Sequence, residues 1–231
     1  MKYIMSDIHG EYQMFLKMLE QIDFSDKDTL YILGDVVDRG PEPIKILQYI
    51  IDKPNIVLLR GNHEEMMLDA LALQNNKEFV STINSRLWMR NGGFVTVDQF
   101  LELSFEEQKR IYEYVKNTKL FEIVDNNLLV HAGIPMTLKT FEDDEELIKF
   151  LKRVSKDDLL WDRDMVENEE YYLDYYYIYC GHTPTLHLHN SNKIYKTKGF
   201  AVIDGGACFA PGILICVCLD NNNVYYQTRI T

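Results

Sequence analysis

The stretch ILGDVVDRG, residues 32–40, decides the fold and gives the first sign of a functional site. Apolar residues run into a glycine turn, which is the pattern of a buried strand that ends in a loop. The loop carries two aspartates, Asp35 and Asp38, and Arg39 follows the second directly. A glycine-flanked aspartate at the end of a strand is often only a turn former, so the rest of the chain must decide what each acid does.

The same pattern of strand, loop and helix occurs three times in the first third of the chain. The predicted strands are 2–5, 29–33 and 55–59, and the predicted helices are 11–22, 41–51 and 66–73. Repeated units of this kind predict a largely parallel sheet with its functional loops at the carboxyl ends of the strands.

The second half of the chain changes character. Residues 75–100 are interpreted as an insertion over the site, and Ser104 begins a capping box for a helix that runs to about Asn117. An Asn126-Asn127 hairpin signal follows, and residues 202–230 contain three more predicted strands with an Asn-rich turn. Parallel units followed by antiparallel strands predict one domain over residues 1–231, with two sheets packed face to face and helices outside.

Charge and composition restrict the class of function. The chain has 231 residues and a formal net charge of -12, which argues against a nucleic-acid partner bound through phosphate neutralisation. No export signal and no apolar stretch of membrane-spanning length is evident, so a cytoplasmic location without a membrane partner is expected. Cys216 and Cys218 alternate in an apolar run and are interpreted as buried small hydrophobic residues.

Three features are interpreted without a catalytic role. The segment EYYLDYYYIYC, residues 170–180, is expected to be a strand packed on a helix, although a rim around a pocket is the alternative. His187 and His189 are expected on an exposed strand edge. Arg60, which precedes a glycine turn, is expected to be structural.

Residues that bind metals or transfer protons follow five predicted strand ends. The five segments are Ser6-Asp7-Ile8-His9-Gly10, Gly34-Asp35, Gly61-Asn62-His63-Glu64, His131-Ala132-Gly133 and Gly181-His182-Thr183, and they contain four of the six histidines. One aspartate or one histidine alone would be read as a turn former or a packed residue. The set in this order indicates a dinuclear metal site.

The donors in these segments are nitrogen and oxygen atoms. Strand alternation is expected to place Asp7 and His9 on one side, where both reach one ion. Asp35 can offer one oxygen to each of two ions, and Asn62, His131 and His182 complete the set. This donor chemistry suits Mn²⁺, Fe or Zn²⁺, while the lack of a thiolate argues against a structural zinc.

The five motifs together resemble those of a known family. SDIHG, GDVVDRG, RGNHE, HAG and GHT look like the motif set of the phosphoprotein phosphatases within the calcineurin-like metallophosphoesterases. The stretches GNHEEMMLD, NGG and LLWDRD resemble the bacterial and bacteriophage lambda type serine/threonine protein phosphatases in particular. The resemblance implies the α/β calcineurin-like fold, an αββα sandwich of two packed mixed sheets. Ser6 departs from the glycine that the family usually has there.

The resemblance also implies how the metal ligands are divided. Asp7, His9 and Asp35 would hold one divalent ion, with Mn²⁺ expected first. Asp35 would bridge to a second ion held also by Asn62, His131 and His182. Water activated by two such ions would attack phosphorus in line, without a phosphoenzyme.

Four further residues receive roles from the resemblance. His63 is expected to protonate the leaving group, with Asp38 as the carboxylate that favours the imidazolium. The alternative is that Asp38 only closes the turn or caps the next helix. Arg39 and Arg163, together with Asn62, are expected to bind the substrate phosphate, although Arg163 could instead belong to a packed aromatic segment beside a surface ion pair.

The expected function is therefore hydrolysis of phosphomonoesters on serine or threonine of a phosphorylated protein or peptide, with phosphotyrosine as an additional candidate substrate. A symmetrical bis(5'-nucleosyl)-tetraphosphatase, a phosphodiesterase and a non-catalytic binding module are the alternatives. Asp38 and Glu64 favour the protein phosphatase over the tetraphosphatase group, in which the first position is typically not acidic and the second is usually aspartate.

Overall fold

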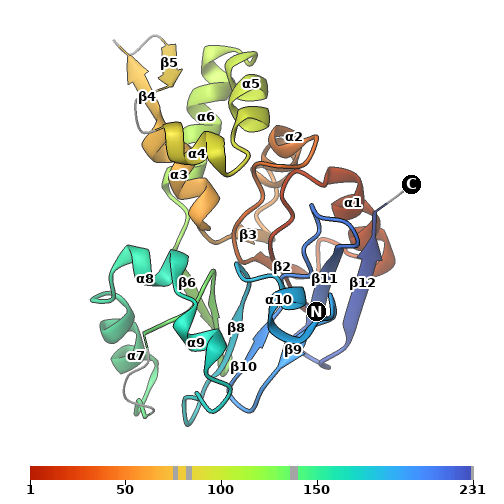
Figure 1. Ribbon diagram of the computed structural model, residues 1–231, viewed down its shortest axis with the longest axis vertical. Coiled ribbons are helices and arrows are strands. Elements are labelled where there is room, and N and C mark those ends of the chain that lie inside the picture. Colours follow the sequence, from red (N-terminus) through yellow and green to blue (C-terminus); the bar gives the residue numbers. More distant parts are fainter. Residues whose placement is uncertain (75–77, 82–84, 136–139, 230–231) are drawn as a thin grey trace.

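The chain forms two mixed five-stranded sheets and a separate two-stranded hairpin (Figure 1). The computed structural model describes residues 1–74, 78–81, 85–135 and 140–229. The first sheet has the order β12-β11-β1-β2-β3, and the second has the order β6-β7-β8-β10-β9. The strand bounds are Lys2–Met5 (β1), Thr29–Ile32 (β2), Ile56–Leu58 (β3), Leu71–Gln74 (β4), Glu78–Ser81 (β5), Phe121–Val124 (β6), Asn127–Val130 (β7), Tyr177–Cys180 (β8), Tyr195–Lys196 (β9), Phe200–Val202 (β10), Ile213–Cys218 (β11) and Val224–Thr228 (β12).

The helices lie outside the paired sheets, with α1 and α2 at one side and α7 to α9 at the other (Figure 1). Their bounds are Tyr12–Gln21 (α1), Pro43–Ile50 (α2), Asn62–Ala70 (α3), Ser85–Arg90 (α4), Phe94–Leu101 (α5), Phe105–Lys116 (α6), Asp144–Leu151 (α7), Lys156–Trp161 (α8), Asp164–Glu167 (α9) and Thr185–His189 (α10). Among the described residues, none of these helices has the length and hydropathy that crossing a membrane requires.

Three apolar layers hold the sandwich together, and strand alternation assigns residues to them. Ile4 belongs to the layer between the sheets, whereas its neighbours Tyr3 and Met5 pack in the layer under the outer helices. Cys216 and Cys218, on the fully buried β11, also face that outer layer, as small buried hydrophobic residues do. The predicted face-to-face packing of two sheets with helices outside is confirmed.

Most predicted elements are present with shifts of one or two residues at their ends. The strand at 2–5 and the helix beginning after Ser104 are confirmed, and Ser104 caps α6 by accepting the N–H of Glu107. Pro43 is the first residue of α2, where its missing N–H costs nothing. The hairpin at 126–127 is also confirmed, as are two of the three strands predicted within 202–230, β11 and β12. The first of the three, β10, lies earlier than predicted and ends at Val202.

Three predictions of local structure are wrong. The helix expected at 66–73 begins earlier, at Asn62, and gives way to β4 at Leu71 because that segment pairs with β5. Of the tyrosine-rich segment 170–180, only Tyr177–Cys180 is a strand. His187 and His189 lie on α10, not on a strand edge, and Asn190 ends that helix with a left-handed φ of 54°.

One buried carboxylate fixes the ends of β2 and β3 against each other. Glu64 is fully buried, and its Oε2 accepts the N–H groups of Asp35 at 2.7 Å and Gly61 at 2.9 Å. Its Oε1 accepts those of Val36 at 2.9 Å and Val37 at 3.3 Å. The side chain therefore supplies the acceptors that the loop after β2 cannot find in a helix or sheet.

We expect Glu64→Gln to lower the free energy of unfolding by about 2–4 kcal/mol. The amide replaces one oxygen with a donor, which removes two of the four bonds and directs an N–H₂ group at backbone N–H groups. Urea unfolding monitored by circular dichroism measures the change. Glu113→Gln, at an exposed position of α6, is the control and should change stability by less than about 0.5 kcal/mol. Equal stability of the two variants would contradict the role given to Glu64.

Candidate active site

The five strand ends named from the sequence meet at one edge of the sandwich. The loops after β1, β2 and β3 come from the first sheet, and those after β7 and β8 come from the second. The side chains gathered there are all buried: Asp7, His9, Asp35, Asp38, Asn62, His63, His131 and His182. Five of these residues have positive φ, a conformation that non-glycine residues seldom adopt: Asp7, His9, Asp35, Asp38 and His182.

The closeness of Asp7 and His9 does not come from strand alternation, and that part of the prediction is wrong. β1 ends at Met5, and the two residues have left-handed φ values of 51° and 46°. Backbone bonds to the neighbouring loop hold them instead: the Asp7 N–H donates to the Gly34 carbonyl at 3.2 Å, and the His9 N–H donates to that of Asp35 at 2.9 Å.

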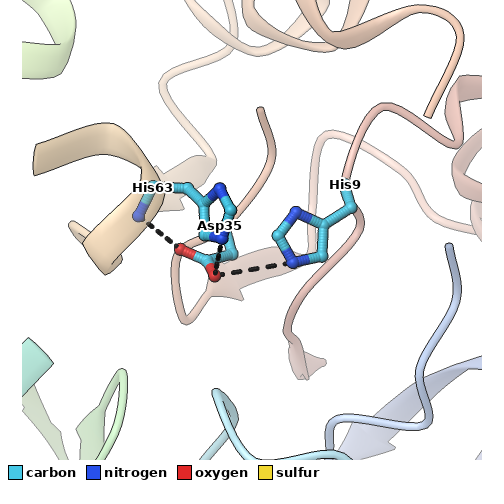
Figure 2. A group of neighbouring side chains, drawn as sticks. All are labelled: His9, Asp35 and His63. Carbon is cyan, nitrogen blue, oxygen red and sulfur yellow. Dashed lines mark hydrogen bonds and ion pairs between the residues drawn. The ribbon is translucent and has the colours of Figure 1, made fainter. Parts of the chain in front are cut away.

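Asp35 lies at the centre, with an imidazole group on each side of its carboxylate. Its Oδ2 is 3.5 Å from His9 Nε2 and 3.8 Å from His63 Nε2. Figure 2 shows this carboxylate between the two rings. Its Oδ1 is 3.5 Å from His131 Nε2 and accepts a hydrogen bond from the backbone N–H of His63 at 3.0 Å. Two groups of metal-ligating residues, His9 with Asp35 and His63, and Asp35 with His131 and His182, thus share this carboxylate.

The second group includes an amide oxygen. Asn62 Oδ1 lies 2.8 Å from His131 Nε2 and 3.1 Å from His182 Nδ1. His182 Nε2 is buried and has no hydrogen-bond partner among the described residues, which is costly for a ring nitrogen. Carboxylate, amide and imidazole donors converging at these distances fit a divalent cation.

Backbone carbonyls orient two of the imidazoles. His131 Nδ1 lies 2.7 Å from the Leu33 carbonyl, and His9 Nδ1 lies 2.9 Å from the Val37 carbonyl. A carbonyl only accepts, so each Nδ1 carries the proton and each Nε2 keeps the lone pair that a metal ion would use. This is how metal-ligating histidines are commonly held.

Burial sets the charge state of the cluster. It lowers the pKa of His9 well below the ordinary value, with the charges of His63 and Arg39 adding to the effect, and it lowers the pKa of His182 to about 2. Neutral imidazoles are the form that binds metals. Burial and the charge of Asp7 raise the pKa of Asp35 well above its usual range. The protein itself therefore places too little positive charge beside this carboxylate to favour its ionised form.

Asp7 is held by contacts from both sheets. Its Oδ2 accepts the Ser6 hydroxyl at 2.5 Å and the backbone N–H of His182 at 3.0 Å. A Cβ on Gly181 would lie 2.1 Å from that oxygen, so glycine is required for this approach. Ser6, which departs from the glycine of the related motifs, therefore fits the turn and orients Asp7.

His63 and Asp38 form a buried pair at the side of the cluster. His63 Nδ1 lies 2.5 Å from Asp38 Oδ2, and both side chains are almost completely inaccessible. Burial raises the pKa of Asp38 to about 7, and hydrogen bonds from Thr96 and Trp88 oppose that rise. Burial and the charge of Arg39 lower the pKa of His63.

Arg39 spans the outer side of the cluster. Its Nη1 donates to His9 Nε2 at 2.8 Å, and its Nη2 donates to His63 Nε2 at 2.9 Å. The guanidinium carbon lies 5.3 Å from the centroid of the Phe209 ring, a cation–π distance. Arg39 also lines a cavity of about 760 Å³ that opens beside the cluster.

Arg163 lies outside the hydrogen-bonded cluster in the described part of the chain. It is exposed and lines a surface pocket of about 290 Å³ with Thr183 and His187. In the described part of the chain no hydrogen bond joins it to the cluster, although its charge contributes to lowering the pKa of His182. Trp161, two residues earlier, packs edge-on against His182 at 5.8 Å between ring centroids.

The structure adds a sixth strand end that the sequence analysis missed. Asp204 follows β10, is buried, and accepts the Gly206 N–H at 2.8 Å. Burial raises its pKa well above the usual range, and the charge of Asp7 adds to that rise. The apolar run before Asp204 and the two glycines after it repeat the signal seen at Gly34-Asp35, so the same rule could have found it.

Comparisons with known proteins agree with this geometry. The chain is 31% identical over 173 residues to serine/threonine-protein phosphatase 2 of Escherichia coli (strain K12), covering 71% of this chain and 69% of that protein. It is 37% identical over 109 residues to the symmetrical bis(5'-nucleosyl)-tetraphosphatase of Buchnera aphidicola subsp. Acyrthosiphon pisum (strain 5A), covering 42% and 40%.

A solved structure shares the fold. The crystal structure of a putative diadenosine tetraphosphatase superposes with a TM-score of 0.70 at 14% sequence identity, covering 100% of this chain and 94% of that one. The family model described as calcineurin-like phosphoesterase matches residues 3–198, a range that contains all five predicted loops. The chain therefore belongs to the calcineurin-like phosphoesterases.

Proposed function

We propose that this phosphoesterase is a metal-dependent serine/threonine protein phosphatase. The observation that carries the proposal is the His63–Asp38 contact of 2.5 Å beside the Asp35 cluster. Serine and threonine phosphates leave as poor alkoxides, which need a proton in the transition state. A buried carboxylate that holds an imidazole at the edge of the cluster is suited to supplying it.

The ligand assignment starts from the two groups around Asp35, with Asp7 in place of His63 in the first and Asn62 added to the second. Asp7, His9 and Asp35 would hold one divalent ion, and Asp35, Asn62, His131 and His182 would hold the other. His63 Nε2 also faces Asp35, but its Nδ1 is engaged by Asp38, which suits an acid better than a ligand. Two bound ions, for which Mn²⁺ is the first candidate and Fe or Zn²⁺ the alternatives, would supply Lewis acidity and lower the pKa of water.

Arg39 is proposed to bind the phosphoryl group. Its two Nη atoms already lie side by side at the mouth of the cluster, and a guanidinium matches two phosphate oxygens. In the present arrangement His63 Nε2 accepts a hydrogen bond from Arg39. When the Arg39 side chain turns to the phosphate, this nitrogen becomes free to carry the proton that the leaving group needs. Asn62, whose Oδ1 faces the imidazoles, has its amide N–H₂ left for a phosphate oxygen, and the exposed Arg163 would assist by moving its side chain.

The second candidate is a symmetrical dinucleoside tetraphosphatase, and it is favoured by the similarity to proteins of that name. Its leaving group is a nucleotide phosphate of lower pKa, which depends less on a protonated His63. The two functions therefore differ in what they require of the His63–Asp38 pair.

Among substrates, we expect a phosphoseryl peptide to give a higher kcat/KM than diadenosine tetraphosphate or an aryl phosphodiester. The measurement uses protein stripped of metal and reloaded with Mn²⁺, with phosphate or nucleotide release followed for each compound. A phosphotyrosyl peptide in the same series tests for dual specificity. Preference for the tetraphosphate or the diester would overturn the proposed function.

For His63→Ala we expect kcat/KM on the phosphoseryl peptide to fall at least about 100-fold, because the alkoxide then leaves unprotonated. Hydrolysis of p-nitrophenyl phosphate, whose leaving group hardly needs a proton, should fall less than about tenfold. His187→Ala, on the exposed α10, is the matched control and should change neither rate. Equal losses on both substrates would remove His63 from the acid role.

For Asp35→Asn we expect at least tenfold weaker binding of both ions, because one oxygen of the shared carboxylate becomes an amide nitrogen. Equilibrium dialysis against Mn²⁺ with elemental analysis measures the number of bound ions and their affinity. Asp125→Asn, at an exposed position 62% accessible, is the control. A variant that keeps two tightly bound ions would refute the bridging assignment.

A further inference from the structure

Helices α4 and α5 lie against the loop that carries Asp38 and Arg39. The Arg39 N–H donates to the Gly92 carbonyl at 3.2 Å, and Arg39 Nε donates to the Asn91 carbonyl at 3.4 Å. The turn between the two helices therefore contacts the backbone and the side chain of a residue at the mouth of the cluster. These contacts make the segment part of the wall of the site.

Among the described residues, the same two helices provide the hydrogen bonds to the Asp38 carboxylate other than that from His63. Trp88 Nε1, on α4, donates to Oδ2 at 2.7 Å, and Thr96 Oγ1, on α5, donates to Oδ1 at 2.5 Å. Thr96 Oγ1 also accepts the Asp38 backbone N–H at 2.9 Å. Both oxygens of Asp38 and its backbone are thus fixed while Oδ2 faces His63 Nδ1.

These donors are set in a close-packed environment. Trp88 and Thr96 are both 0% exposed, so neither group can exchange its bond for one to bulk water. A Cβ on Gly93 would lie 2.5 Å from the indole of Trp88, so glycine allows the ring to pack under the turn. The indole orientation is consequently determined by the turn that also contacts Arg39.

We propose that Trp88 and Thr96 are positioning residues for the leaving-group acid. They hold the Asp38 carboxylate in the one orientation that aligns His63, so α4 and α5 support the proton transfer. A short contact between His63 and Asp38 requires a carboxylate that does not rotate, and two donors on opposite oxygens prevent rotation. The inference rests on the proposed acid role of His63.

The alternative is that Trp88 and Thr96 only support packing, and leaving-group dependence separates the two. We expect Thr96→Val, which keeps the side-chain shape, and Trp88→Phe each to lower kcat/KM on the phosphoseryl peptide about 10- to 100-fold. Both should lower it less than about threefold on p-nitrophenyl phosphate, with the Mn²⁺ content unchanged. Thr96→Ser, which retains the hydroxyl, should restore most of the lost rate.

Val97→Ala is the matched control on α5. Val97 is buried and apolar and belongs to the same core as Trp88, so its truncation loosens the helix without removing a bond to Asp38. We expect it to lower the unfolding midpoint while changing the two substrates by equal factors. Equal factors for Thr96→Val and Trp88→Phe as well would overturn the inference.

A readout without substrate tests the same geometry in case the proposed function fails. In ¹⁵N-histidine-labelled protein, we expect the His63 Nδ1–H proton to give a downfield resonance that Thr96→Val and Trp88→Phe shift and Val97→Ala does not. An unshifted resonance in the first two variants would contradict positioning. If His63→Ala lowers the rate on both substrates equally, the acid role of His63 fails. If His63→Ala affects the phosphoseryl peptide more than p-nitrophenyl phosphate but Thr96→Val and Trp88→Phe do not, only the roles of Trp88 and Thr96 are overturned.

Discussion

The Glu64 carboxylate accepts hydrogen bonds from four backbone N–H groups, and the rest of the site depends on them. The loop after β2 cannot satisfy these donors itself, because Asp35 adopts a left-handed conformation in order to point into the cluster. Glu64 satisfies them from the first turn of α3, the same turn that carries Asn62 and His63. One buried side chain therefore fixes the central carboxylate and the residues that surround it.

The two aspartates of the GDVVDRG loop differ in function because their surroundings differ. Asp35 faces imidazole nitrogens on both sides, so its oxygens are arranged for cations. Asp38, three residues later, faces one imidazole and two neutral donors from α4 and α5, so it is arranged to hold a ring in place. Both acids have positive φ values, 56° at Asp35 and 73° at Asp38, and they approach different nitrogens of the His63 ring, Nε2 and Nδ1.

Much of the fold and of the site could be predicted because the signals are local. Short apolar runs that end in small polar turns predicted the strands and their functional loops. Four of the six expected metal ligands, His9, Asp35, His131 and His182, lie in the two groups that share Asp35. The errors arose where packing overrides local pattern. The alternating histidines of α10 imitate a strand, the segment from Leu71 joins β5 in place of continuing α3, and Asp7 meets His9 through a turn.

The sequence by itself determined which donors the site contains and in what order the strands deliver them, because those features are written in runs of a few neighbouring residues. Only the tertiary structure decided how the donors are oriented. The bonds from Trp88 and Thr96 to Asp38 cross 50 and 58 residues, and the His131 ring is oriented by a carbonyl 98 residues away. No local period records such contacts, since they exist only once the helices have packed over the loop and the two sheets have closed on each other.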